Sequence, residues 1–175
     1  MQNRKLAIGV AILGMVLVTA VQAQQKMASP PGTADVTLKG KQITIAYSRP
    51  SMRGRKIMGE LVPYGQVWRT GANEATTFTT PIDLNIGGTN VPAGKYTLWT
   101  LPSESTWKLI INKQTGQWGT EYHEDQDLAR VNMQKSQTSH PVEQFTISWK
   151  KNSDTSADLV MEWENTGVWV AVKAK

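Results

Sequence analysis

The sequence predicts an all-β fold, a single-domain antiparallel β-sandwich of about nine or ten strands, and three observations support it. Apolar and polar residues alternate along most of the chain after Ala34, which is the period of half-buried strands. Turn-forming residues separate these segments at the spacing of about 8 to 12 residues that is typical of sandwiches and barrels. No segment has the apolar period of a convincing amphipathic helix, and no internal repeat indicates a solenoid or propeller.

Residues 1–23 are expected to be a secretory signal peptide. Arg4 and Lys5 precede an apolar run from Leu6 to Ala20, and the small-residue ending at Ala23 is a typical cleavage site. A retained membrane anchor is the alternative, but this run is shorter than the roughly 20 residues that a spanning helix needs. We therefore expect export to the periplasm or the medium, with no membrane anchor after cleavage.

Composition narrows the classes of protein further. The chain contains no cysteine, so neither a disulfide nor a cysteine-linked lipid is expected. One core is sufficient without them, because a domain of about 150 residues buries about 70% of the surface that its unfolded chain exposes. The formal net charge of +5 includes Arg4 and Lys5 and is otherwise spread along the chain. A nucleic-acid partner is therefore not expected, since such proteins carry a stronger basic footprint.

The elements follow in chain order. Residues 24–33 are polar, contain Pro30, Pro31 and Gly32, and are expected to be a flexible leader, so that the sandwich domain spans residues 34–175. A turn is expected within NIGGTNVPAG, and a hairpin between KYTLWTL and TWKLIIN, turned at residues 102–105. The strands expected to point one apolar face inward contain Ile43, Ile45 and Tyr47; Phe145, Ile147 and Trp149; Leu159, Met161 and Trp163; and Val168, Val170 and Val172.

The chain has seven tryptophans, for which two interpretations exist. They either form a platform on which sugar rings stack or pack within the core and on the sheet faces. Trp107, Trp149 and Trp163 lie in phase with apolar neighbours, which favours core packing. Trp99 and Trp169 lie in the opposite phase, so each is expected to cover the outer face of a sheet or to line a groove.

The first candidate binding segment is SRPSMRGRK, residues 48–56. It brings Arg49, Arg53, Arg55 and Lys56 together around a proline and a glycine. Guanidinium groups at this spacing can chelate a carboxylate, phosphate or sulfate. The alternative is a solvated basic loop or a set of salt bridges.

The second candidate segment is VWRTGANEATT, residues 67–77. Gly71 permits a tight turn, across which Arg69 could form an ion pair with Glu74 while Asn73 bonds the backbone, making this a structural corner. In the functional interpretation, Arg69, Asn73 and Glu74 point outward beside Trp68 and recognise a polar ligand. Glu74 is then the carboxylate available for acid-base chemistry.

The third candidate is EYHEDQD. In an extended backbone Glu121, His123, Asp125 and Asp127 share one side, and these groups can hold a divalent cation. A solvated acidic loop is the alternative, since no recognised ligand spacing appears. The chain also has no serine elbow, phosphate-binding glycine loop or paired histidine motif.

Several words of the sequence occur together: YSRPSMRGRKIMGELVPYGQVWRTGANEATTF, VPAGKYTLWTLP, W.LIIN and WG..Y. In these words the chain resembles a bacterial family of exported proteins, known as domain-of-unknown-function family twenty-nine eleven, over roughly residues 28–172. The resemblance implies no reaction, cofactor or catalytic residue. It implies that one group of residues forms a unit, because all lie in the first word: Arg49, Arg53, Arg55, Trp68, Arg69, Asn73 and Glu74.

Three functions fit these observations. The first is an exported β-sandwich protein that binds a polar or anionic small molecule or an envelope glycan through the arginine loop and residues 67–77. The second is a metal-dependent hydrolase that uses Glu74 or residues 121–127. The third is a structural or assembly protein of the cell envelope. No cofactor is expected, and the sequence leaves open whether the protein is an enzyme.

Overall fold

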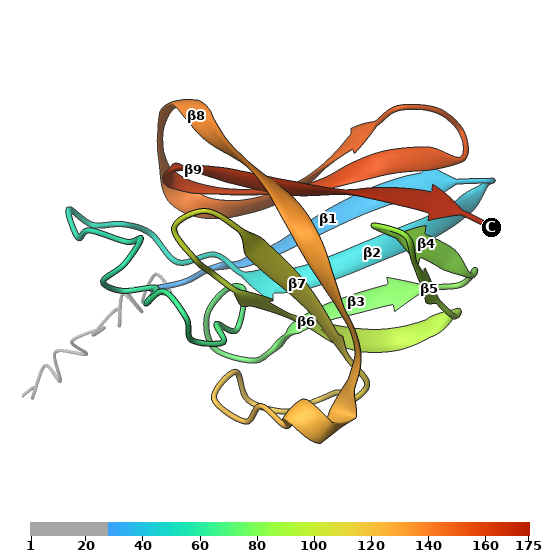
Figure 1. Ribbon diagram of the computed structural model, residues 1–175, viewed down its shortest axis with the longest axis horizontal. Helices are drawn as coiled ribbons and strands as arrows, with labels where there is room; N and C mark the ends of the chain where they lie inside the picture. Colours follow the sequence, from blue (N-terminus) through green and yellow to red (C-terminus); the bar gives the residue numbers. More distant parts are fainter. Residues whose placement is uncertain (1–27) are drawn as a thin grey trace, which may run out of the picture.

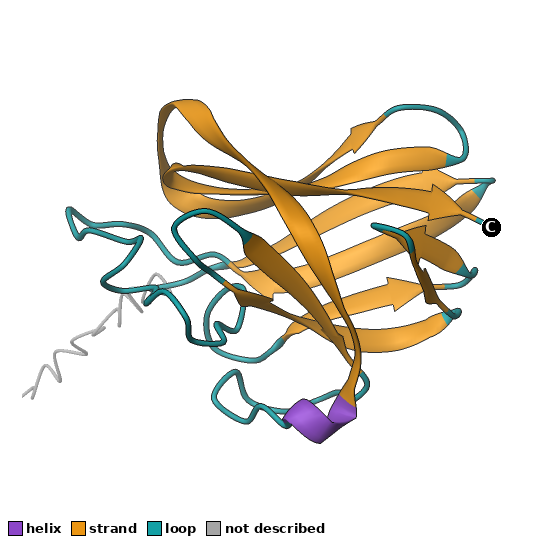
Figure 2. Cartoon of the chain, in the orientation of Figure 1, coloured by secondary structure: helices purple, strands orange, loops and turns teal. Residues whose placement is uncertain are grey.

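The computed structural model describes residues 28–175 (Figure 1). The expected signal peptide and residues 24–27 of the expected leader lie outside the described residues. The described chain is almost entirely β-structure, with one short 3-10 turn at Glu124–Gln126 (Figure 2), so the all-β prediction is confirmed. The strands are β1 Pro31–Leu38, β2 Lys41–Ser48, β3 Thr76–Thr80, β4 Leu84–Ile86, β5 Thr89–Val91, β6 Gly94–Leu101, β7 Trp107–Asn112, β8 Asp127–Lys151 and β9 Ser156–Ala174. No helix in residues 28–175 has the length and apolar character needed to cross a membrane.

The nine strands form one hydrogen-bonded sheet in the order β1-β2-β3-β6-β7-β8-β9-β4-β5, with every pair antiparallel. Strands β8 and β9 are 25 and 19 residues long and bend across the molecule (Figure 1). The first part of β8 pairs with β7 and the remainder pairs with β9. The register of β8 against β9 shifts twice between Gln137 and Thr146. Such irregularities bend a strand, and here they fold the sheet into the two layers of a sandwich.

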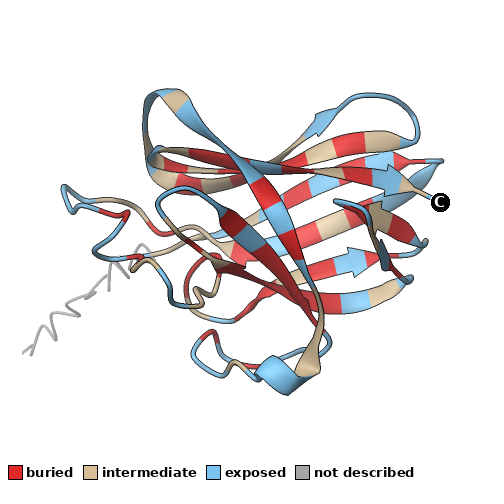
Figure 3. Cartoon of the chain, in the orientation of Figure 1, coloured by how far each residue is buried: buried red, intermediate tan, exposed pale blue. Residues whose placement is uncertain are grey.

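The core lies between these layers, and the predicted alternation fills it. Buried and exposed residues alternate along the strands (Figure 3). A bond within the core also ties the layers together, because the Tyr47 hydroxyl of β2 accepts a hydrogen bond from the backbone N–H of Ile147 in β8 at 2.9 Å. The predicted core residues that the structure buries are Ile43, Ile45, Tyr47, Phe145, Ile147, Leu159, Met161, Trp163, Val168, Val170 and Val172.

The first strand begins earlier than the sequence predicted. Strand β1 starts at Pro31, which pairs with Ser48, whereas residues 24–33 were expected to be a leader. Pro31 and Gly32 are tolerated there because β1 is an edge strand, where a missing backbone donor disrupts no neighbour. The free edge of β1 is also covered, since Trp149 Nε1 donates to the carbonyl of Ala34 at 3.3 Å. This cover limits pairing with another chain.

The tryptophans divide between the core and the surface. Trp107 and Trp163 are each 2% exposed, which confirms core packing, and Trp149 is partly buried against the core. Trp169 lies exposed on the outer face of β9. Trp99 is buried in a second, smaller apolar cluster with Ala75 and Ile110, on the other face of the sheet.

Candidate functional site

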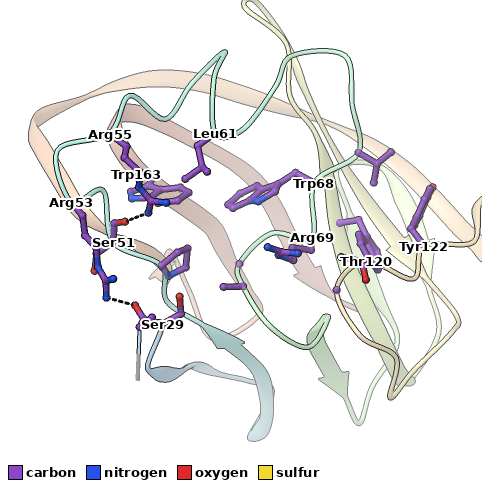
Figure 4. Close-up of a pocket in the computed structure, with 17 residues that line it drawn as sticks. Ser29, Ser51, Arg53, Arg55, Leu61, Trp68, Arg69, Thr120, Tyr122 and Trp163 are labelled. Carbon is purple, nitrogen blue, oxygen red and sulfur yellow. Dashed lines mark hydrogen bonds between the residues drawn. The ribbon is translucent and has the colours of Figure 1, made fainter. Parts of the chain in front are cut away.

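A cavity of about 560 Å³ opens at one end of the sandwich, where three parts of the chain meet (Figure 4). One wall comes from the long connection between β2 and β3, residues 49–75. The second comes from residues 119–122, which precede β8, and the third from Ala28 and Ser29 at the start of the described chain. Trp163 of β9 and Trp99 of β6 also reach it. The cavity therefore combines residues that are far apart in the sequence.

Four of the seven predicted ligand-binding residues line this cavity: Arg53, Arg55, Trp68 and Arg69. In Figure 4, Arg53 and Arg55 lie toward one end, Tyr122 and Thr120 toward the other, and Trp68 and Arg69 between them. Two residues of the arginine loop and two of the WRTGANE segment therefore lie around one cavity.

Arg49, Asn73 and Glu74 do not line the cavity. Arg49 is half-buried and bonds β8, donating from Nε to the Phe145 carbonyl at 3.4 Å and from Nη2 to Thr146 Oγ1 at 3.1 Å. Asn73 donates from Nδ2 to Ser48 Oγ at 3.2 Å. Glu74 is exposed, and its backbone forms an isolated bridge with Trp118. These residues hold the connection in place rather than facing the cavity.

Residues 67–77 form the tight backbone corner that the structural interpretation predicted, but the predicted ion pair between Arg69 and Glu74 does not form in the described chain. Thr70, Gly71 and Asn73 all have positive φ, at 52°, 153° and 60°. A Cβ at Gly71 would lie 2.9 Å from the Ser48 carbonyl oxygen, so only glycine fits this tight turn. The ion pairs formed within residues 28–175 do not include Arg69 with Glu74. The corner consequently leaves the Arg69 charge available to the cavity.

Arg69 is fixed by packing. Its side chain lies against Gly119, where an added Cβ would come within 2.5 Å of Arg69 Cδ. Its Nε is buried and has no hydrogen-bond partner within the described chain. The neighbouring Trp68 exchanges two backbone hydrogen bonds with Thr100 of β6, at 2.8 and 2.9 Å, so the segment is anchored to the sheet. The guanidinium is therefore held at the cavity without a carboxylate.

Arg53 and Arg55 are held by backbone carbonyls. Arg53 Nη2 donates to the Ala28 carbonyl at 3.0 Å, and Arg55 donates to the carbonyls of Met52 and Ser51 at 2.9 and 2.7 Å. Glu143 lies nearby, but it accepts from the backbone N–H of Arg53. A guanidinium has five N–H donors, so each arginine keeps donors for a ligand.

Among residues 28–175, those lining the cavity include three arginines and no aspartate or glutamate. None of these three arginines takes part in an ion pair within the described chain, so the fixed charges of the lining residues are positive. Oriented donors on cationic groups favour an anion that accepts several hydrogen bonds.

Aromatic rings form the apolar part of the cavity. Trp68 stacks on Trp163 with ring centroids 5.8 Å apart and meets the edge of Phe145 at 4.9 Å. Trp99 and Tyr122 form a second pair, with centroids 5.0 Å apart. Trp68 is half-buried and lines the cavity, so its ring contacts both the core and the cavity.

The predicted metal-binding segment has another arrangement. Residues 124–126 form a 3-10 turn, so the extended backbone that would align Glu121, His123, Asp125 and Asp127 does not form. Asp127 accepts hydrogen bonds from Tyr122, Asn112 and Arg130, at 2.6, 2.8 and 2.8 Å. His123 and Asp125 are exposed. Within residues 28–175 no group of three His, Cys, Asp or Glu side chains is arranged to hold a metal ion.

The same segment instead positions Tyr122 in the cavity wall. Its hydroxyl donates to Asp127 and accepts from Arg130 Nη2 at 2.9 Å. Burial, and then the hydrogen bond to Asp127, raises the pKa of Tyr122 above its usual value. The phenol therefore stays neutral, with its ring held against Trp99.

Sequence reasoning did not place Trp99, Gly119, Thr120, Tyr122 and Trp163 in the site. Two signals were present in part. The opposite phase of Trp99 left a groove or an outer sheet face open, and Gly119 and Tyr122 belong to the word WG..Y, one of those that carry the family resemblance. Trp163 has the same phase as ordinary core residues, so the local pattern does not distinguish it.

Comparison with known proteins yields one match. A family model described as "Protein of unknown function (DUF2911)" matches residues 29–172. No curated protein and no solved structure matches the chain.

Proposed function

The chain belongs to the family described as protein of unknown function (DUF2911), and from its cavity we propose that it is an exported protein that binds a small organic anion. One observation carries the proposal: within the described residues 28–175, three guanidinium groups and no carboxylate line one cavity. The negative charge of the proposed ligand would pair with these guanidinium groups.

Electrostatics supports this assignment. Like charges gathered in one cavity repel one another, and an anion bound among them relieves this repulsion. A purely structural arginine cluster is expected to recruit carboxylates, as Arg130 does with Glu124 and Asp127. Arg53, Arg55 and Arg69 instead have backbone carbonyls or no partner at their Nε and Nη atoms.

The size and lining of the cavity support a small molecule. Small-molecule sites usually occupy about 300–1,000 Å³ and combine aromatic walls with a few polar groups. The cavity of about 560 Å³ has this size, and Trp68, Trp99 and Tyr122 are among its lining residues. A macromolecular partner would instead call for a broad exposed surface.

Export is part of the proposal and rests on the amino-terminal residues 1–23. Their charged start, apolar run and small-residue ending are typical of a signal peptide. The ligand is accordingly expected among molecules of the cell envelope or the medium.

The hydrolase alternative has less support. Glu74 lies outside the cavity, and Asp127 is bonded to Arg130, Tyr122 and Asn112. Neither carboxylate is therefore placed for acid-base chemistry in the cavity.

Calorimetry and thermal unfolding with citrate, glucuronate and inorganic phosphate test the proposal. A ligand at ten times its Kd stabilises the folded state by about 1.4 kcal/mol, which raises the melting temperature by a few degrees. We expect at least one of these anions to raise the melting temperature. Arg69→Gln should weaken the binding of that anion about tenfold, because a charge-assisted hydrogen bond is lost. The control is Lys95→Gln, which removes one exposed charge from β6. Unchanged binding in Arg69→Gln, or no shift with any of the three anions, would contradict the proposal.

A further inference from the structure

The cavity offers three kinds of contact at once, and together they narrow the ligand class. Figure 4 shows the guanidinium groups, the indole rings and the hydroxyl-bearing Thr120 around the same space. An anion alone requires only the first kind. The others call for a ligand with a flat apolar face and hydroxyl groups.

The aromatic contact comes from Trp68 and Tyr122. Trp68 is fixed in orientation because it stacks on Trp163 and its backbone is bonded to Thr100. Tyr122 is fixed because Asp127 and Arg130 hold its hydroxyl. Rings that are already held in place lose little entropy when a ligand stacks on them. The C–H face of a sugar ring is apolar and flat enough to stack in this way.

The polar contact comes from side-chain hydroxyls. Thr120 is exposed at the cavity, and its hydroxyl makes no hydrogen bond within residues 28–175. Ser29 and Ser51 also line the cavity. A hydroxyl both donates and accepts, as a sugar hydroxyl does. The Ser51 hydroxyl already accepts from Gln144 Nε2 at 3.4 Å, so Thr120 is the hydroxyl that a simple aromatic acid would leave without a ligand partner.

The charged contact is supplied by Arg69, with Arg53 and Arg55 toward one end (Figure 4). A planar guanidinium matches the two oxygens of a carboxylate. Resting on the anion-binding function proposed above, we propose that the ligand is a short acidic saccharide. Its carboxylate binds Arg69, and a sugar ring stacks on Trp68 while its hydroxyls bond Thr120.

Titration calorimetry with three matched probes tests this assignment, using protein expressed from the full sequence. The probes are a disaccharide of glucose and glucuronic acid, the neutral disaccharide of two glucose units, and citrate, an anion without a ring. We expect the acidic disaccharide to bind at least about tenfold more tightly than either of the others, because only it uses all three contacts.

Two variants separate the contacts. Thr120→Val keeps the shape of an exposed side chain and removes its hydroxyl. This variant is expected to weaken the binding of the acidic disaccharide about threefold without changing the binding of citrate. Trp68→Phe retains an aromatic ring in the core. It is expected to weaken the binding of both disaccharides and to leave the binding of citrate unchanged. Circular dichroism confirms that each variant is folded.

The outcomes distinguish this inference from the proposed function. If citrate or phosphate binds at least as tightly as the acidic disaccharide, the saccharide assignment is overturned and anion binding stands. If the neutral disaccharide equals the acidic one and Arg69→Gln changes nothing, both are overturned. Absence of binding by every probe also overturns both.

Discussion

Arg69 keeps its charge at the cavity by packing rather than by pairing. Its Nε is buried with no hydrogen-bond partner in the described chain, and its stem lies against the backbone at Gly119. A buried donor without a partner costs about 1–3 kcal/mol. The site therefore carries an unmet hydrogen bond, which an oxygen of a ligand or of water can satisfy.

Gly119 is the residue that permits this packing. A Cβ at position 119 would lie 2.5 Å from Arg69 Cδ and 2.5 Å from the carbonyl oxygen of Asn73. The side chain can move, but the Asn73 carbonyl accepts the Gly119 N–H at 2.9 Å and is part of the backbone. We expect Gly119→Ala to lower the free energy of unfolding by about 1–3 kcal/mol, as overpacking does. Urea denaturation measures this loss.

Gly116→Asn is the matched control in the same loop. Gly116 has a φ of 82° and no atom within 4 Å of an added Cβ, and asparagine tolerates this conformation. Its free energy of unfolding is expected to change by no more than about 0.5 kcal/mol. Equal stability of Gly119→Ala and the wild type would contradict the close packing over Arg69.

Tyr122 gives the site a dependence on alkaline pH. Burial and the hydrogen bond to Asp127 raise its pKa in the folded protein above the value of about 10 in the unfolded chain. The folded state therefore binds the Tyr122 phenol proton more tightly than the unfolded chain does. The contribution of this phenol to stability is complete below pH ~10 and is lost as pH rises above 10.

The measurement compares the wild type with Tyr122→Phe between pH 8 and pH 11. The raised pKa of Tyr96, caused by burial and by Asp83, affects both proteins alike. We expect the wild type to lose more stability above pH 10 than Tyr122→Phe does. Parallel curves would show that the hydroxyl is not held as described.

At the scale of elements, the connection of residues 49–75 carries most of the site and is attached to both layers. The Pro50 carbonyl accepts from the backbone N–H of Phe145 in β8 at 2.9 Å, and the Met52 N–H donates to the Glu143 carbonyl of β8 at 2.8 Å. Trp68 is bonded to β6. A long connection without regular strands is usually functional, and these bonds hold this one in a fixed shape.

Glu164 of β9 holds the middle of the connection. Its carboxylate accepts hydrogen bonds from the backbone N–H groups of Ile57 and Met58, at 3.4 and 3.0 Å. Glu164→Ala leaves these two donors without partners, and we expect a loss of about 1–3 kcal/mol in stability. The loosened connection should also be cut faster by trypsin at the exposed Arg53, Arg55 and Lys56.

Glu162→Ala serves as the control, because it removes a carboxylate from the same strand. Glu162 forms no ion pair within residues 28–175. Its trypsin cleavage rate should match that of the wild type. Equal rates in Glu164→Ala and Glu162→Ala would show that Glu164 does not anchor the connection.

The elements that could be predicted from the sequence are those whose pattern is local. Alternation identified β2 and two segments that the structure joins in the single strand β9, and turn residues located the β4–β5 turn and the β6–β7 hairpin. The early start of β1 was missed because Pro31 and Gly32 are typical of loops, whereas an edge strand tolerates them. The metal-binding interpretation of residues 121–127 required an extended backbone, but the backbone turns at Glu124–Gln126.

The candidate site divides in the same way. Arg53, Arg55, Trp68 and Arg69 could be grouped because they lie within one connection. Trp99, Tyr122 and Trp163 join them only through the strand order, which periodicity does not reveal. The expected Arg69 to Glu74 pair failed because side-chain direction in a corner with three positive φ angles does not follow from spacing.

At the scale of the whole molecule, the bend of β8 and β9 creates the cavity. Because these strands carry the sheet from one layer to the other, Trp163 of β9 reaches residues 49–75, which leave from β2. The connection lies at one end of the sandwich and the carboxyl terminus at the other (Figure 1). The cavity therefore depends on the packing of the two layers against each other.

Tyr47 tests how strongly the two layers are joined. Its hydroxyl accepts from the buried N–H of Ile147 at 2.9 Å, and its ring meets the edge of Phe145 with centroids 5.8 Å apart. Tyr47→Phe keeps the ring contact and leaves the N–H without a partner, so we expect a loss of about 1–3 kcal/mol. The urea midpoint should fall while the m-value stays constant, because the buried surface is unchanged. Tyr64→Phe is the control, since the Tyr64 hydroxyl makes no hydrogen bond within residues 28–175. Equal urea midpoints for Tyr64→Phe and Tyr47→Phe would contradict a specific bond between the layers.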